Sequence, residues 1–551
     1  MKAAKETVEV NLTELEALLE RKREVLGEED YQKLKKGLWA LSYLTDRIGD
    51  KDTTISQLRA LLMKPSTEKT RKVLEQAGLP ASSSSSHPPP SVGANQSPKK
   101  KPGHGRNGAE AYRGAERIKI AHPSLKPGDG CPECEKGKVY RQKDPAVRIR
   151  VVGQVPLQAT VYQLERLRCN LCGVVFEAEA PEGVGDKKYD ESAAAMIGLL
   201  RYGNGFPGYR LEGLEASLGI PLPASPQWEI VEGAAEVIRP AFDELIRQAA
   251  QGEVFYNDDT SMKILALARA SPQRVEGEEE ASSARERTGL FTSGIVSRTR
   301  QGQRIVMFFT GRKHAGENFA RVLAERAQGL SPPIQMCDAL SRNLPKLPQK
   351  LEIIVGHCTA HARRRFVQVT PNFPQECRFV LETLGEVYGY DAEAKERGLS
   401  PEARLHFHQE HSEPVMKQLH AWFLAQFEEK RVEPNSGLGE AITYCLKHWE
   451  RLTLFLRQAG APLDSNVVER ALKKRILHRK NSLFYKTENG AEVGDLYMSL
   501  IHTCELNNAN PFDYLTELQK HADELAQNPA AWMPWNYRQT LEQTGRSKPT
   551  V

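Results

Sequence analysis

The 551-residue sequence predicts an α+β protein made of several domains, and three features of the chain support this expectation. Its length exceeds what a single hydrophobic core usually fills. Helical patterns on both sides enclose five short β-rich segments between residues 252 and 357. Two CxxC pairs precede those segments and predict a small module stabilised by a metal.

The order of these patterns divides the chain into eight expected regions. They are an N-terminal leucine-rich helical (coiled-coil) region at 1–80, a disordered basic linker at 81–120, a zinc ribbon at 121–185, a helical region at 186–250, the first part of a β-rich core at 251–365, a helical insertion at 366–463, a core helix at 464–505 and a C-terminal cap at 506–551. The insertion interrupts the core, and the cap is expected to be peripheral.

The composition excludes several classes of protein. With 27% charged residues, 40% hydrophobic residues and a net charge of +5, the chain has the composition of a soluble globular protein. The start, MKAAKETVEV, lacks an apolar signal region, and no run of about 18 apolar residues is present to span a membrane. Nine cysteines in so long a chain argue against a disulfide scaffold. We expect a cytoplasmic protein without a membrane partner.

The N-terminal region has an apolar residue at every seventh position. The series is Leu34, Leu41, Ile48, Ile55 and Leu62. This spacing predicts either a coiled coil that makes the protein a homo-oligomer or a helix that packs on its own domain.

The linker carries a short basic cluster within a segment rich in Ser, Pro and Gly. Its cations are Lys99, Lys100, Lys101 and Arg106. They either follow DNA phosphates and enter a minor groove or form a solvated tail.

Four cysteines have the spacing of a structural zinc site. Cys131 and Cys134 form CPEC, Cys169 and Cys172 form CNLC, and strand-like sequence lies between the pairs. Four thiolates in this arrangement suit one tetrahedral Zn2+, whose usual role is to fold a small module.

Residues 208–228, GYRLEGLEASLGIPLPASPQW, predict a helix, a glycine turn and a second helix. This pattern fits a DNA-contacting helix-turn-helix or a structural helical hairpin.

The β-rich segments predict a sheet whose strand ends carry acids. The segments are GEVFYND at 252–258, GLFTSGIVS at 289–297, RIVMFFT at 304–310, PIQMCD at 333–338 and LEIIVGH at 351–357. A helical pattern, HAGENFARVLAERAQ, separates the third from the fourth. In an RNase H-like sheet the first and fourth strands are neighbours, so Asp258 and Asp338 would lie side by side and Glu469, on a later helix, would join them.

Three converging carboxylates would repel each other unless cations compensate, and this arrangement suits two Mg2+ (or Mn2+) ions acting on a phosphodiester. Taken singly, an aspartate at a strand end is usually a turn residue, and Glu469 with Lys473 has the spacing of an ordinary helical ion pair. Cations follow Glu469 and would hold the nucleic-acid strand. They are Arg470, Lys473, Lys474, Arg475, Arg479 and Lys480.

The segment HCTAHARRRF also contains cysteine and histidine, which bind metals in other proteins. Nothing near Cys358 and His361 in the sequence completes a metal site. We expect packing or DNA contact from Arg363, Arg364 and Arg365.

Several longer motifs resemble those of the insertion-sequence-sixty-six transposases of bacteria. They are the two zinc knuckles, YNDDT, CTAHARRRF, NVVERALKKRILHRKNSLFY and HTCELNNANPFDYL. The resemblance implies a DDE transposase with an RNase H-like catalytic core. Such an enzyme binds the ends of an insertion sequence, cleaves DNA and transfers strands with a metal-dependent mechanism.

Carried onto this chain, the family pattern points to Asp258, Asp338 and Glu469 as catalytic residues and ligands of two Mg2+ ions. The family's first motif is usually Asp-Glu-Thr and here is Asp-Asp-Thr, so Asp259 is the alternative first ligand. The second is usually Asp-Gly-Tyr and here is Asp-Ala-Leu. The resemblance also implies element-end and target double-stranded DNA as partners, small accessory proteins of the same element, and a place at the bacterial nucleoid.

Two other functions fit parts of this pattern. A DNA-binding protein descended from a transposase would explain the altered second motif without catalysis. A nuclease that cleaves RNA on the same fold would show no strand joining.

Overall fold

The structure of the chain is a computed structural model that describes most of the expected regions. The described residues are 12–49, 69–77, 79, 118, 120, 122–134, 136–142, 147–148, 155–168, 170, 174–182, 187–269, 289–348 and 351–547. Several predicted residues lie outside these ranges, namely Ile55, Leu62, Lys99, Lys100, Lys101, Arg106, Cys169 and Cys172. No helix within the described ranges combines the length and apolarity that a membrane crossing requires.

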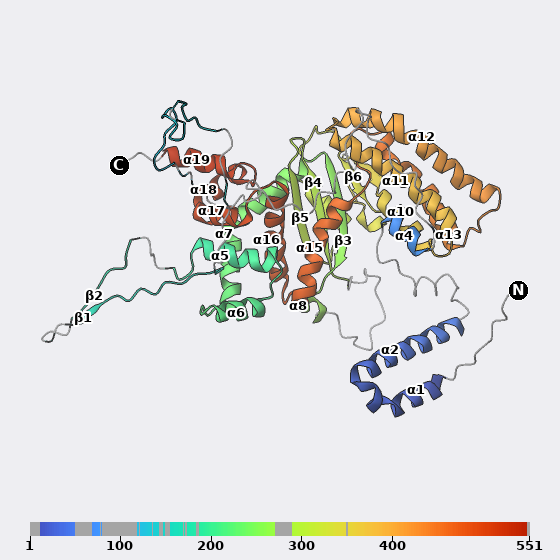
Figure 1. Ribbon diagram of the computed structural model, residues 1–551, viewed down its shortest axis with the longest axis horizontal. Coiled ribbons are helices and arrows are strands. Elements are labelled where there is room, and N and C mark those ends of the chain that lie inside the picture. Colours follow the sequence, from blue (N-terminus) through green and yellow to red (C-terminus); the bar gives the residue numbers. More distant parts are fainter. Residues whose placement is uncertain are drawn as a thin grey trace.

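The fold is mixed α+β, and a five-stranded sheet lies at its centre (Figure 1). The strands are β3 (Val254–Ser261), β4 (Phe291–Arg298), β5 (Arg304–Gly311), β6 (Ile334–Cys337) and β7 (Ile354–His357). Their order across the sheet is β5-β4-β3-β6-β7. Strand β3 runs antiparallel to β4 and parallel to β6. All five expected strand segments are confirmed, and the first and fourth are neighbours as the sequence analysis expected.

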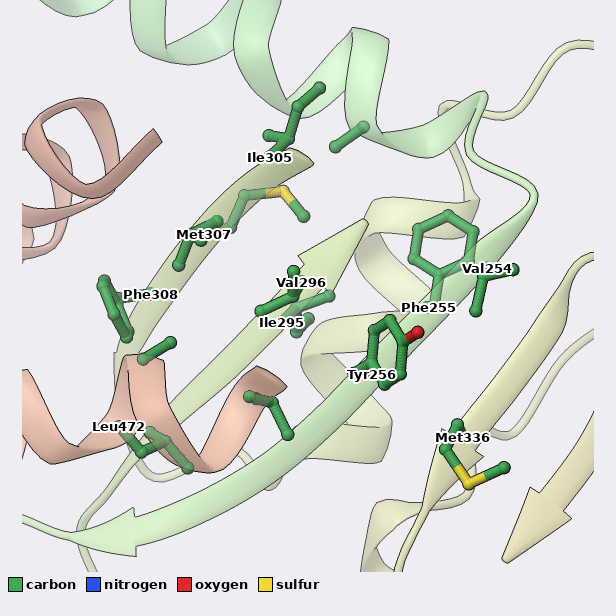
Figure 2. Packing of buried hydrophobic residues seen from close by; sticks show 14 of the residues in the cluster. Val254, Phe255, Tyr256, Ile295, Val296, Ile305, Met307, Phe308, Met336 and Leu472 are labelled. Carbon is green, nitrogen blue, oxygen red and sulfur yellow. The ribbon is translucent and has the colours of Figure 1, made fainter. Parts of the chain in front are cut away.

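Helices cover both faces of this sheet, which explains why its central strands are apolar on both sides. Helix α9 (Ala315–Leu323) packs on one face, where Phe319 lies 4.9 Å from the ring of Phe255. Helix α15 (Asn466–Ser482) crosses the other face (Figure 1). Figure 2 shows Leu472 of α15 lying against the strands close to Phe308. The sheet is therefore the middle layer of the core.

Helix α16 (Glu488–Leu506) lies along β5, the edge strand of the sheet. Alternate residues of β5 donate their backbone N–H groups to polar side chains of α16 and its C-cap. These side chains are spaced four residues apart along the helix. The donors Thr310, Phe308, Val306 and Arg304 pair with Asp495 at 2.6 Å, Ser499 at 3.0 Å, Thr503 at 3.0 Å and Asn507 at 3.2 Å. The helix thus satisfies backbone groups that an edge strand would leave unbonded.

A block of helices follows β7, as expected for the insertion. It comprises α10 (Thr359–Val369), α11 (Pro374–Glu396), α12 (Pro401–Glu428), α13 (Gly437–Lys447) and α14 (Trp449–Leu452). The segment after α14 packs closely on β7 at Gly356, where an added Cβ would lie 2.7 Å from Met336 and 3.1 Å from Leu454. The block is therefore anchored at the β7 edge of the sheet.

Helices that precede β3 in the sequence and helices that follow α16 complete the core. They are α5 (Glu191–Gly198), the π-helix η2 (Leu199–Gly203), α6 (Gly208–Ser217), α7 (Ala224–Ala250), α17 (Pro511–Lys520), α18 (Ala522–Gln527), the 3-10 helix η5 (Pro529–Trp532) and α19 (Tyr537–Ser547). Leu515 and Trp532 are buried in the main hydrophobic cluster, so the C-terminal region is an integral part of the core rather than peripheral.

The expected helix-turn-helix segment forms α6 and α7, joined at Gly219 with φ +80°. Val231, Ile238 and Leu245 of α7 are fully buried in the main cluster. Because α7 is a core helix, the structure favours a structural hairpin over DNA reading by this helix.

The N-terminal helices α1 (Leu12–Arg21) and α2 (Arg23–Gly49) contact each other as a hairpin. Leu34, in the heptad series, is 49% exposed. Self-association through this region stays a prediction. A third helix, α4 (Thr70–Gln76), buries Val73 and Leu74 and contacts α11.

Candidate active site

Asp258 and Asp338 lie next to each other because their strands are parallel neighbours. Asp258 is near the end of β3, and Asp338 directly follows the last residue of β6. The side-chain amide of Asn343 donates to Asp338 Oδ1 at 2.5 Å and to Asp258 Oδ1 at 3.4 Å. One amide group therefore connects the two carboxylates.

The electrostatics of this pair favour a cation. The pKa of Asp258 is raised to about 6. Burial is the main cause and the charge of Asp338 adds to it, whereas hydrogen bonds from the Asp259 backbone N–H and from Asn343 act in the opposite direction. A carboxylate that is costly to ionise beside another carboxylate gains most from a positive charge between them. Oxygen donors of this kind are the ligands that Mg2+ prefers.

Asp259 points to the opposite face of β3, since successive side chains alternate along a strand. Its carboxylate accepts a hydrogen bond from the Ser293 hydroxyl at 2.8 Å and lies 3.0 Å from Nδ1 of His314. The side chain is 1% exposed. Asp259 is thus bound within the α9 side of the core, while Asp258 lies on the α15 side.

Glu469 reaches the same end of the sheet because α15 packs closely on β4. Gly294 of β4 pairs with Asp258 across the strands. A Cβ at Gly294 would lie 2.9 Å from Leu472 and 3.4 Å from Val468. Since Val468 precedes Glu469 in the first turn of the helix, the bare backbone at Gly294 allows this turn to approach the aspartates.

Two residues of α10 hold the Glu469 side chain. Arg364 Nη2 lies 3.4 Å from Oε2, and His361 Nε2 lies 3.7 Å from Oε1. Oε1 is buried and lacks a hydrogen-bond partner. The positive charge of His361 also acts on Asp258, whose pKa it lowers. Among the described residues no hydrogen bond joins Glu469 to either aspartate.

Folding also brings together three side chains of the types that bind metals, which was not expected from the sequence. The expectation that nothing completes a metal site beside Cys358 and His361 is wrong, because Glu469 lies next to them. Donor atoms of the three side chains all lie within 4.8 Å of one another. Cys358 caps the start of α10, and its Sγ accepts the backbone N–H of Ser465 at 3.2 Å.

One predicted DNA-binding residue has a different role. Arg475 is 2% exposed and forms a buried ion pair with Asp495 of α16. It also donates to the hydroxyl of Tyr485 at 2.9 Å. The prediction of DNA contact is therefore wrong for Arg475, which joins α15 to α16.

Some of the other cations of α15 are bound to groups of the protein, and some are exposed and available to a ligand. Lys474 is paired with Glu505 at 2.5 Å, and Arg479 donates to the hydroxyl of Ser261 at 2.7 Å. Three remain exposed on the helix without an ion pair within the described part of the chain, namely Arg470, Lys473 and Lys480. DNA binding by this surface stays a prediction.

The arginines of α10 contact other side chains of the protein, although Arg365 is exposed. Arg363 donates to the hydroxyl of Thr70 at 2.9 Å, Arg364 holds Glu469, and the guanidinium of Arg365 lies 4.0 Å from the centre of the Tyr444 ring. Of the two expected roles, packing is the one that these contacts favour.

The first CxxC pair lies in a short turn, and zinc binding by it stays a prediction. Residues on either side of it pair through an antiparallel bridge between Gly130 and Lys138. Backbone N–H groups of residues 136 and 137 lower the pKa of the Cys134 thiol, with Cys131 contributing. The second CxxC pair lies between β1 (Arg166–Arg168) and β2 (Val175–Glu177), which form an antiparallel hairpin. Its cysteines are outside the described residues.

Sequence reasoning missed two residues that shape the site. Asn343 follows Asp338 by five positions, but a lone asparagine after a strand gives no signal of an amide bridge. Gly294 is one glycine among 41, and only the approach of α15 reveals its role.

The chain is similar to other proteins over much of this fold. The family described as "Transposase IS66 family" matches residues 187–493. Three relatives from Sinorhizobium fredii (strain NBRC 101917 / NGR234) are described as uncharacterized proteins. They are y4jD, 28% identical over 69% of this chain and 73% of its own length; y4qI, 26% identical over 63% and 62%; and y4hP, 25% identical over 69% and 68%.

Proposed function

Because the chain belongs to the IS66 family of transposases, we propose that it is a DDE transposase that cleaves DNA at the ends of an insertion sequence and joins the 3′-hydroxyl to target DNA. The observation that carries this proposal is the juxtaposition of Asp258 and Asp338, bridged by Asn343. Glu469 stands on the helix that covers them.

The order and direction of the strands support an RNase H-like core. Three antiparallel strands, β5, β4 and β3, continue into two parallel ones, β6 and β7. Because β3 and β6 are parallel, Asp258 and Asp338 lie at the same end of the central strands. The helical block follows β7 and precedes α15 in the sequence.

The residues fit a divalent cation. Asp258 and Asp338 offer oxygen donors with few compensating charges nearby, which is the chemistry of a Mg2+ or Mn2+ site. We assign Asp258, Asp338 and Glu469 as the protein ligands for two such ions. When bound, the ions would activate the attacking oxygen and stabilise the leaving one.

The other residues position these ligands. Asn343 orients the two aspartates, and Arg364 orients Glu469. Asp259 keeps the end of β3 in place through Ser293 and His314. We therefore assign the first ligand to Asp258 rather than Asp259.

The DNA is expected to lie over the exposed face of α15. Arg470, Lys473 and Lys480 would contact its phosphates, which carry no sequence information but fix its position. A zinc ribbon formed by Cys131, Cys134, Cys169 and Cys172 would add a further contact module, and oligomers or accessory proteins would bring two ends together.

Paired isosteric variants test the catalytic assignment. Duplexes carrying the DNA that flanks the gene serve as substrate with Mg2+. Asp258→Asn should abolish strand transfer and keep DNA binding, because it removes a metal ligand and no phosphate contact. Asp259→Asn should keep strand transfer and lower stability, because it weakens the contact with His314.

The opposite pattern would place the ligand at Asp259. Wild-type protein that binds these duplexes but never cleaves them, with Mg2+ or Mn2+, would instead support a DNA-binding protein without catalysis. Cleavage of RNA alone would support a nuclease.

A further inference from the structure

We propose that Cys358, His361 and Glu469 form a second metal site, which binds Zn2+ and withdraws Glu469 from the catalytic pair. The site contains neither Asp258 nor Asp338, and its donors besides Glu469 are the sulfur of Cys358 and a nitrogen of His361. The binding itself does not depend on the proposed function, whereas its inhibitory effect does.

The three donors come from two elements that meet at this point. Cys358 and His361 occupy the start of α10, one helical turn apart, and Glu469 occupies the first turn of α15. Donor atoms of all three lie within 4.8 Å of one another. A shift of side chains, without movement of either helix, would bring them to bonding distance of one ion.

The donors are also available. Oε1 of Glu469 is buried and has no hydrogen-bond partner. Nε2 of His361 faces this oxygen at 3.7 Å. Arg364 binds the other carboxylate oxygen, Oε2, at 3.4 Å and so leaves Oε1 toward His361. Buried polar atoms without partners are uncommon in folded proteins, and a ligand is one explanation of them.

The donor set selects the metal. One thiolate, one imidazole and one carboxylate suit Zn2+, whereas Mg2+ prefers oxygen alone. Three protein ligands leave one position of a tetrahedral ion open to water. Binding requires loss of the Cys358 thiol proton to solvent, and the backbone N–H of Ser465 stabilises the resulting thiolate at 3.2 Å.

A cation bound here would hold the Glu469 carboxylate beside Cys358, away from the two aspartates. With Oε1 bound beside Cys358, Glu469 could not serve an ion at Asp258 and Asp338. Zn2+ would then inhibit strand transfer supported by Mg2+, and the inhibition would require Cys358.

Cobalt is the probe for binding, since a Co2+–thiolate bond gives a charge-transfer absorption band. The full chain, already loaded with zinc and freed of weakly bound metal, is titrated with Co2+. We expect one added Co2+ per chain with this band. Cys358→Ser should abolish the band, and His361→Gln should weaken binding by at least about tenfold, because it removes a ligand.

The matched control is Cys377→Ser on α11, another fully buried cysteine outside the cluster. It should titrate as the wild type does. Thermal melts show which variants are folded. A band that persists in folded Cys358→Ser protein, or its absence from wild type, would overturn the proposal.

Inhibition is measured separately. Added Zn2+ should reduce Mg2+-supported strand transfer by wild type and Cys377→Ser at least about tenfold more than transfer by Cys358→Ser. Equal inhibition of all three would overturn the regulatory part. Failure of the proposed function would appear as wild type without strand transfer in the absence of Zn2+, which leaves the cobalt result unaffected.

Discussion

Adding a single methyl group at Gly294 should displace the helix that carries Glu469. An alanine Cβ there would meet Leu472 Cδ2 at 2.9 Å and Cγ at 3.0 Å. Carbon atoms normally approach to about 3.5–4.0 Å, so the overlap is roughly 0.5–1 Å. Rotation of Leu472 about χ2 moves Cδ2 but not Cγ, and Cγ can move by χ1 rotation only between the two values that an α-helix allows. We therefore expect a shift of α15 and a loss of about 1–3 kcal/mol in unfolding free energy.

The same shift should affect catalysis more than stability. A displacement of about 1 Å at a catalytic group can reduce the rate about hundredfold. Gly294→Ala should accordingly lower the strand-transfer rate while leaving DNA affinity near the wild-type value. The assays are urea denaturation, strand transfer and DNA titration on the same preparations.

A double variant tests whether the contact with Leu472 is the cause. Leu472→Ala alone should cost about 2–5 kcal/mol, because Leu472 is 4% exposed. Combined with Gly294→Ala it should cost clearly less than the sum, since the new methyl group occupies space that the leucine vacates. Gly311→Ala is the control, because no atom lies within 4 Å of its Cβ position. Additive costs, or equal effects of the two glycine variants, would refute the reasoning.

Three further predictions concern α15. Burial lowers the pKa of His478 to about 3, so the unfolded chain binds a proton that the folded chain does not, and stability should fall as pH drops from about 6.5 toward 3; His478→Phe should reduce this slope, by up to about 1.4 kcal/mol per pH unit in urea denaturation. Arg475→Ala should destabilise by about 3–5 kcal/mol because it leaves Asp495 buried and unpaired, and normal stability would contradict the ion pair. Lys473→Ala with Lys480→Ala should make the slope of log K against log salt less negative by about 1.8 on duplex DNA, and an unchanged slope would indicate that these lysines only form a solvated face.

The strands were predictable because their signal is local. Alternating or continuous β-rich segments with turn residues between them identify β3 to β7, and an acid at the end of GEVFYND and of PIQMCD follows directly. The adjacency of Asp258 and Asp338 then depends only on strand order.

Side-chain partners were not predictable, because they come from distant segments. Arg475 looks like its exposed neighbours in the sequence, and only the position of Asp495 on α16 shows that it is buried. Cys358 and His361 lack a third ligand until α15 brings Glu469 beside them. In both cases the charge pattern of one helix could not reveal what the next helix contributes.

The bonds between α16 and β5 depend on two different repeats that nearly match. Four residues of helix rise about 6.0 Å, and two residues of strand about 6.8 Å. The mismatch of about 0.8 Å per step is tolerable over the interval from Asp495 to Asn507 but would exceed hydrogen-bond reach in a much longer strand. Pairing with α16 therefore limits how long β5 can be while all of these hydrogen bonds form. Deleting one residue in the middle of α16 would turn the following side chains about 100° away from the strand, whereas an insertion after Asn507 would leave the alignment intact.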